Sequence, residues 1–217
     1  MNKSTIFGGW AVSPEILKKV FGDDADYIDV NRIMPKLFDA PHQLKNDWVD
    51  VVINEYQFAD NPQNVMGGWS TGAMFAYAAA QVCNPEKLIL LSATPCFCRK
   101  DDFRFGTRPA AVDQMINALG RDKNAVLQSF YERCGLAYDP AAIPNYTIDE
   151  LSHGLMFLKQ ADLRPLAPPP TSPTLYHGTD DLIIPVSASK YFCDQVNGNH
   201  IEQPGGHAFF IEKLVSY

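Results

Sequence analysis

Three side chains in this sequence could form a serine nucleophile with its base and its acid: Ser70, His207 and one of the neighbours Asp180 and Asp181. A serine hydroxyl is a poor nucleophile at neutral pH, so it needs a base within hydrogen-bonding reach and an acid that orients the base. Each candidate follows a stretch that is typical of a strand. Groups that follow parallel strands gather at one edge of the sheet, so we expect these side chains to meet there and to perform covalent acyl transfer.

Ser70 is the central residue of a Gly-x-Ser-x-Gly pattern at residues 68–72. A short apolar run precedes the pattern, and an alanine-rich stretch typical of a buried helix follows it. In the order strand, sharp turn, helix, this pattern holds the serine in a strained backbone geometry with its hydroxyl exposed. Gly68 and Gly72 are expected because a side chain at either position would collide with the neighbouring strand or helix.

The base and the acid are expected in two later turns. His207 follows Gly205-Gly206 after the last expected strand, in the one place that the chain order leaves for the base. Asp180 and Asp181 lie between His177-Gly178 and Pro185, and a simple turn role is the alternative for this pair. A substrate contact is the alternative to a structural role for His153, whereas the context of the other histidines singles none of them out.

The negative oxygen that forms during acyl transfer needs two preorganised N–H donors. We expect one from the backbone of Thr71, the residue after the nucleophile. The other is expected from the backbone of Trp10, because the turn Gly8-Gly9-Trp10 follows the first expected strand. The Trp10 side chain is expected to line an acyl pocket or to pack as a core aromatic, and these two roles do not exclude each other.

Alternating strands and helices predict an α/β fold with a mainly parallel sheet. No strand pattern appears between Ser92 and Pro173, which is too long for a simple crossover. We therefore expect residues 99–162 to be a helical cap inserted in a core of residues 1–98 and 163–217. The expected strands are 4–7, 27–30, 64–66, 87–92, 174–178 and 199–202, and the expected helices are 13–20, 43–58, 73–80, 112–134, 148–161, 186–196 and 208–214.

Composition narrows the class of protein. The 217 residues can form one domain with a sizeable core, and the net charge of −7 argues against nucleic-acid or membrane-surface partners. No apolar run reaches membrane-spanning length, and the first residues hold no signal-peptide core. Five cysteines without a secretion signal suggest reduced, buried thiols in the cytoplasm. Cys96 and Cys98 are too close together for the usual zinc pair, and we expect neither a metal nor a cofactor.

With these pieces placed, the chain resembles the α/β-hydrolase superfamily, and within it the pimeloyl-[acyl-carrier protein] methyl ester esterases of biotin synthesis. The serine pattern is shared by the whole superfamily, whereas the stretches 92–97 and 154–164 are more specific. The departures are a Gly-Gly-Trp turn in place of His-Gly-Trp, an insertion with its own sequence, and a shortened N-terminal part of the sheet. The matching stretches are Gly8-Gly9-Trp10, residues 68–72, residues 92–97, residues 154–164 and Gly205-Gly206-His207-Ala208.

The resemblance has consequences for the site. In the superfamily the acid stands four residues after the His of His-Gly and four before Pro, which selects Asp181, although one residue of loop slip would select Asp180. It implies a Ser70–His207–Asp181 triad that hydrolyses a carrier-bound methyl ester. An apolar acyl chain would suit a pocket lined by Trp10, Phe97, Phe103, Phe130 and Met156, with plain core packing as the alternative for these side chains.

The family also implies a partner, because its helical cap receives the acidic acyl-carrier protein through basic residues. Residues 99–133 hold seven cations and five carboxylates, a net charge of +2, against −9 for the rest of the chain. A locally basic cap on an acidic body can steer an acidic carrier. An ordinary solvated helix face is the alternative. The cations are Arg99, Lys100, Arg104, Arg108, Arg121, Lys123 and Arg133.

Two other functions stay open at this point. A general short-acyl carboxylesterase or thioesterase would have the same triad, because residues of the cap set the substrate. A non-catalytic small-molecule receptor with the hydrolase fold could retain the triad as well. Rates on carrier-bound and free esters separate the first alternative, and turnover separates the second.

Overall fold

The centre of the molecule is a six-stranded sheet in the order β2-β1-β5-β6-β7-β8, in which every neighbouring pair is parallel. The computed structural model describes residues 3–40, 42–58 and 63–211. The predicted α/β class with a mainly parallel sheet is confirmed. The strands are β1 (Lys3–Phe7), β2 (Asp26–Ile28), β5 (Gln63–Trp69), β6 (Lys87–Leu91), β7 (Pro173–Gly178) and β8 (Asn199–Gln203).

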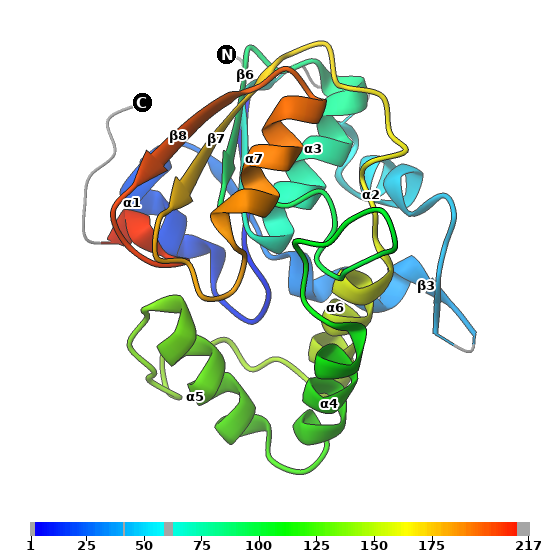
Figure 1. Ribbon diagram of the computed structural model, residues 1–217, viewed down its shortest axis with the longest axis vertical. Coiled ribbons are helices and arrows are strands. Elements are labelled where there is room, and N and C mark those ends of the chain that lie inside the picture. Colours follow the sequence, from blue (N-terminus) through cyan, green and yellow to red (C-terminus); the bar gives the residue numbers. More distant parts are fainter. Residues whose placement is uncertain (1–2, 41, 59–62, 212–217) are drawn as a thin grey trace.

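Helices flank this sheet (Figure 1). Helix α3 (Thr71–Cys83) packs on β1, β5 and β6, and α7 (Val186–Gln195) packs on β7 and β8. The alanines of α3 are fully buried, because small side chains let this helix lie close to the strands. The short α1 (Lys18–Phe21) contacts the 3₁₀ turn Phe209–Ile211.

Three helices fill the crossover from β6 to β7, and we call them the cap helices: α4 (Pro109–Leu119), α5 (Lys123–Cys134) and α6 (Ile148–Gln160). They lie beyond the carboxyl ends of the strands, toward which the arrowheads of β7 and β8 point (Figure 1). The sequence predicts one helix over 112–134, whereas the structure has two. Asp122 starts the second of them, because its side chain accepts a hydrogen bond from the N–H of Ala125.

The structure also corrects other element boundaries; the helix expected over 13–20, for example, is a 3₁₀ turn over Pro14–Leu17 followed by α1. The helix expected over 43–58 is α2 (Trp48–Tyr56), because Gln43–Leu44 forms β4 and pairs with β3 (Phe38–Asp39). Val30 was expected to end a strand, but it starts a 3₁₀ turn over Val30–Arg32 that the Asp29 side chain caps. Of the expected closing helix 208–214, the described part holds the turn Phe209–Ile211, and residues 212–214 lie outside the described residues.

Candidate active site

Ser70 sits in the sharp turn between β5 and α3. Its φ of 56° lies in the left-handed region, and its N–H donates to the carbonyl of Leu91 at 2.9 Å. A Cβ atom at Gly68 would lie 2.2 Å from the Gly72 oxygen, and one at Gly72 would lie 2.2 Å from the Phe7 oxygen. The crowding that the sequence predicts at both glycines is therefore confirmed. The turn places Ser70 at the first turn of α3, where the helix dipole favours negative charge.

His207 and Asp181 come together at the same edge of the sheet. Nδ1 of His207 lies 2.8 Å from Oδ2 of Asp181, and both side chains are fully buried. The other carboxylate oxygen of Asp181 accepts the N–H groups of Ile183 and Ile184 at 2.8 and 2.9 Å. Asp180 is exposed, and its side chain contacts Thr179 instead. Of the two candidate acids, Asp181 is thus the one that touches the histidine.

The charge of Asp181 is held by its surroundings. Burial acts to raise the pKa of this carboxyl, but His207 and His177 together lower it well below its usual range. The carboxylate accepts the proton on Nδ1 of His207, which leaves a lone pair on Nε2. This buried Nε2 has no hydrogen-bond partner among the residues that the structure describes. In particular, it is not hydrogen-bonded to Ser70. The ring is therefore arranged to accept a proton at Nε2.

His177, which the sequence analysis left without a role, also contacts the acid. Its Nε2 lies 3.1 Å from Oδ2 of Asp181 and 2.8 Å from the carbonyl oxygen of Ile184. The ring is completely buried, at the end of β7. Its one sequence signal was a position four residues before Asp181. The carboxylate of Asp181 is thus shared by two imidazole rings.

The residues of the two expected oxyanion donors, Trp10 and Thr71, line the same cavity as Ser70. Thr71 is the first residue of α3, and Trp10 follows β1. Within the described ranges, neither backbone N–H has a recorded acceptor. The Trp10 ring is 2 % exposed; it donates through Nε1 to the Leu151 carbonyl at 2.9 Å and packs edge-on against Phe130. Both expected positions of the ring, in the core and along the pocket, are occupied at once.

A cavity of about 560 Å³ lies between Ser70 and the cap helices, and its lining is mainly apolar. Phe97 and Phe130 line it, as the sequence analysis expected, together with Val126 and Leu155. Phe103 and Met156 are not among the lining residues. The expectation for Phe103 is corrected because this ring is buried in a separate cluster with Cys96, Ile184 and Ala188. Met156 is half-buried on α6, away from the lining face that Leu155 and Leu158 provide.

The seven cap cations fall into three groups. Lys100 is paired with Asp162 at 3.0 Å. Three others donate to backbone carbonyls: Arg99 to Gly106, Lys123 to Tyr146 and Arg133 to Leu182. The remaining three are exposed, and no ion pair is recorded for them within the described ranges: Arg104, Arg108 and Arg121. Arg121 and Arg133 also line the cavity.

Helix α5 of the cap is hydrogen-bonded to the loops that carry Asp181 and His207. Arg133 donates to the carbonyl of Leu182, next to the acid. The carbonyl of Cys134 accepts the N–H of Ala208, next to the base. His207 itself is fixed through its carbonyl, which accepts the indole N–H of Trp69 and the hydroxyl of Ser92. The bonds from Arg133 and Cys134 therefore connect the cap to the segments that follow β7 and β8.

The described residues hold no group of three or more His, Cys, Asp and Glu side chains that could bind a metal ion. The five cysteines are free and buried. Burial raises the pKa of Cys83 and of Cys98 to about 11, so these thiols stay protonated at neutral pH. In the part of the chain that the structure describes, every helix is too short or too polar to cross a membrane.

No protein-family model matches the chain, but individual relatives do. A pimeloyl-[acyl-carrier protein] methyl ester esterase of Stenotrophomonas maltophilia is 28% identical, over 70% of this chain and 65% of its own length. The chain thus aligns with less than two thirds of that relative. A protein of the same name from Wigglesworthia glossinidia brevipalpis is 26% identical, over 96% of this chain and 90% of its own length.

Solved structures share the architecture at lower identity. An esterase from Exiguobacterium antarcticum superposes with a TM-score of 0.71 at 18% identity, covering 97% of this chain and 87% of its own. BioG from Haemophilus influenzae superposes with a TM-score of 0.62 at 18% identity, covering 97% and 92%. Together with the parallel sheet and the Ser70 turn, these matches place the chain in the α/β-hydrolase fold, with a sequence that resembles the pimeloyl-[acyl-carrier protein] methyl ester esterases.

Proposed function

We propose that this chain is a serine esterase that hydrolyses the methyl ester of pimeloyl-[acyl-carrier protein] in biotin synthesis. The observation that carries the proposal is the position of Ser70: it lines an apolar cavity under the cap helices, in a site where His207 is bonded to Asp181. The substrate is proposed from the relatives, which are pimeloyl-[acyl-carrier protein] methyl ester esterases by name. The mainly apolar lining of the cavity suits a flexible, apolar acyl chain.

The reaction begins when Ser70 Oγ attacks the ester carbonyl and its proton passes to Nε2 of His207. The resulting oxyanion accepts hydrogen bonds from the backbone N–H groups of Trp10 and Thr71. The tetrahedral intermediate collapses, the C–O bond to the methoxy group breaks, and His207 protonates the departing oxygen to give methanol. Water then attacks the acyl-enzyme and gives a proton to His207, and the free carboxylate leaves as Ser70 regains its hydrogen.

The cap supports a carrier protein as the partner. Arg104 and Arg108 are exposed, and no carboxylate of the described chain is recorded against either of them. Arg104 precedes α4, and Arg108 is the N-cap residue of this helix. Residues of α4 line the cavity. An acidic carrier that docks there would bring its acyl arm to the cavity while its charges meet these guanidinium groups.

The test compares three esters with purified protein: pimeloyl-carrier methyl ester, dimethyl pimelate and p-nitrophenyl butyrate. We expect a kcat/KM for the carrier-bound ester well above that for dimethyl pimelate, and an abolished acylation burst in Ser70→Ala. The double variant Arg104→Glu/Arg108→Glu should lower kcat/KM for the carrier ester alone. Arg121 and Arg133 are left unchanged, because they line the cavity.

The matched control is Lys19→Glu/Lys87→Glu, which makes the same change of charge at two exposed lysines outside the cap. It should leave all three rates near wild type. Equal losses in both double variants would show a general charge effect and remove the docking surface. Cleavage of the two small esters without the carrier ester would make the protein a general carboxylesterase, and tight ligand binding without any turnover would make it a receptor.

A further inference from the structure

Residues 9–12, which we call the oxyanion loop, adopt a backbone that needs external support. Ala11 has a φ of 58°, in the left-handed region that L-residues rarely adopt. The loop also contains Trp10, whose N–H is the expected oxyanion donor. An N–H group stabilises a developing charge only when it is already aimed before the reaction. The structure must therefore contain groups that fix the peptide planes of this loop.

The Asn31 side chain, which lies in the core, binds the oxyanion loop. Its side chain is completely buried; Nδ2 donates to the carbonyl of Gly9 at 3.2 Å, and Oδ1 accepts the N–H of Ala11 at 2.8 Å. The carbonyl of Gly9 and the N–H of Trp10 belong to one trans peptide and point in opposite directions. The bond to Gly9 thus turns the Trp10 N–H away from Asn31, and the bond to Ala11 occupies the next donor along the chain. Within the described residues, the N–H of Trp10 has no recorded acceptor, and it lies between Gly9 and Ala11, which are both bonded to Asn31.

Asp29 in turn fixes the Asn31 amide. Its Oδ1 accepts the second Nδ2 hydrogen of Asn31 at 2.8 Å and the backbone N–H of Asn31 at 3.0 Å. All three polar hydrogens and the amide oxygen of Asn31 are therefore used. The orientation of the amide is unambiguous, because a flipped amide would face the Ala11 N–H with a donor.

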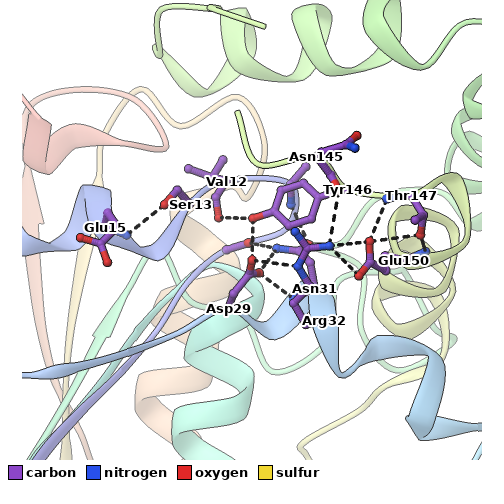
Figure 2. Close-up of polar contacts among 12 residues, drawn as sticks. Val12, Ser13, Glu15, Asp29, Asn31, Arg32, Asn145, Tyr146, Thr147 and Glu150 are labelled. Atoms are coloured by element: carbon purple, nitrogen blue, oxygen red, sulfur yellow. Dashed lines mark hydrogen bonds and ion pairs between the residues drawn. The ribbon is translucent and has the colours of Figure 1, made fainter. Parts of the chain in front are cut away.

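The cap reaches this network through Tyr146, which lies just before α6. Figure 2 shows its hydroxyl between Asp29 and Val12: it donates to Oδ2 of Asp29 at 2.9 Å and lies 3.3 Å from the Val12 oxygen. Burial raises the pKa of Tyr146, so the hydroxyl keeps its proton. Arg32, the residue after Asn31, also connects this segment to the cap, because it forms an ion pair with Glu150 of α6 at 2.8 Å.

We propose that Asn31 is a positioning residue of the oxyanion hole. We also propose that Tyr146, which is bonded to Asp29, makes the orientation of Asn31 depend on the position of the cap. This inference rests on the proposed esterase function, because an oxyanion hole has no role without acyl transfer. It assigns no contact between Asn31 and the substrate. Its effect passes through the Gly9–Trp10 peptide, so it should appear in the transition state and not in substrate binding.

The test uses p-nitrophenyl butyrate, which makes it independent of the carrier substrate. Asn31→Ala should lower kcat by roughly 10²- to 10³-fold, the loss typical of one oxyanion donor, with KM within about twofold of wild type. Affinity for an alkyl boronic acid, which forms a tetrahedral adduct with serine, should fall in parallel with kcat. The control is Asn145→Ala, because Asn145 is exposed and enters the network only through its backbone carbonyl.

Tyr146→Phe provides the second variant, which retains the ring and removes only the hydroxyl. We expect a smaller fall in kcat than for Asn31→Ala, and no further fall when Tyr146→Phe is added to Asn31→Ala, because both act through one chain of bonds. This variant also keeps the proposal testable where Asn31→Ala does not fold, as judged by circular dichroism and melting temperature.

The possible outcomes separate the two proposals. Wild-type protein that turns over no ester contradicts the esterase function itself. Wild-type protein that is active, with an Asn31→Ala variant of equal kcat, removes the positioning role and leaves the esterase in place. A loss that appears only in KM, or fully additive effects of the two variants, would also overturn it.

Discussion

Asp181 meets His207 with one carboxylate oxygen, 2.8 Å from Nδ1, while its other oxygen is held by the N–H groups of Ile183 and Ile184. The acid is thus fixed by its own loop before it touches the histidine. Since Nδ1 of His207 is bonded to Asp181, Nε2 is the ring nitrogen that is left without a recorded partner among the described residues. The loop after β7 therefore fixes Asp181, and Asp181 in turn orients His207, the proposed base.

Asp181→Asn should lower kcat by about 10⁴-fold, because an amide nitrogen facing Nδ1 would favour the wrong tautomer of His207. KM should change little. Asp180→Asn is the matched control, because Asp180 is exposed and, among the described residues, its side chain is hydrogen-bonded to Thr179 and not to His207. Steady-state rates on p-nitrophenyl butyrate measure both. A large loss in Asp180→Asn with an active Asp181→Asn would mean that the loop slips by one residue in solution.

The pKa of Asp181 also predicts how stability depends on pH. Two histidine contacts outweigh burial and lower this pKa in the folded state, so the unfolded chain binds the proton more readily. The stabilisation is therefore present above the unfolded value of about 3.9 and is lost as the pH falls toward the folded pKa. Urea unfolding of wild type and Asp181→Asn should show a constant difference from pH 6 to pH 5 and a shrinking one below pH 4. A difference that grows in acid would contradict the direction of the shift.

The sequence was informative where a local pattern has one structural meaning. Apolar runs separated by helix patterns predicted the parallel sheet. The glycines at 68 and 72 predicted the crowded turn around Ser70, because a Cβ atom at Gly68 would meet the backbone of α3 and one at Gly72 would meet the backbone of Phe7 and Gly8. The resemblance to the α/β-hydrolase acid loop favoured Asp181 over Asp180, and Asp181 is the one of the two that contacts His207.

The sequence was uninformative where function depends on contacts between distant residues. Asn31 lies 20 positions from Ala11, and Tyr146 lies 117 positions from Asp29, so no periodicity connects either pair. Phe103 was predicted to line the pocket because it is an aromatic residue in the insertion. The turn between Lys100 and Phe103 instead directs its ring onto α7. Only the folded chain shows which apolar side chains face the cavity.

The cavity predicts a selective change of substrate range. Val126 is half-buried on α5 and lines the cavity, so Val126→Trp should fill part of the space above Ser70. We expect kcat/KM for p-nitrophenyl octanoate to fall at least about tenfold relative to p-nitrophenyl acetate. Val82→Trp makes the same substitution at an exposed position of α3 and should change neither rate. A uniform loss on both esters would indicate misfolding, and unchanged selectivity would mean that the acyl chain lies elsewhere.

Gly154 is the point at which α6 meets the oxyanion loop. A Cβ atom there would lie 2.5 Å from Cδ1 and 2.8 Å from Nε1 of Trp10, the same ring that donates to Leu151.

Gly154→Ala should therefore push the helix from the ring, destabilise the fold by about 1–3 kcal/mol and lower kcat together with it. The matched control is Gly120→Ala in the same cap, where the nearest atom to a Cβ is 3.7 Å away and the φ is −69°. That change should stabilise the protein by about 0.4–1 kcal/mol without affecting turnover. Thermal unfolding and ester kinetics of both variants decide the matter, because a fully active Gly154→Ala would show that Trp10 need not be held by the cap.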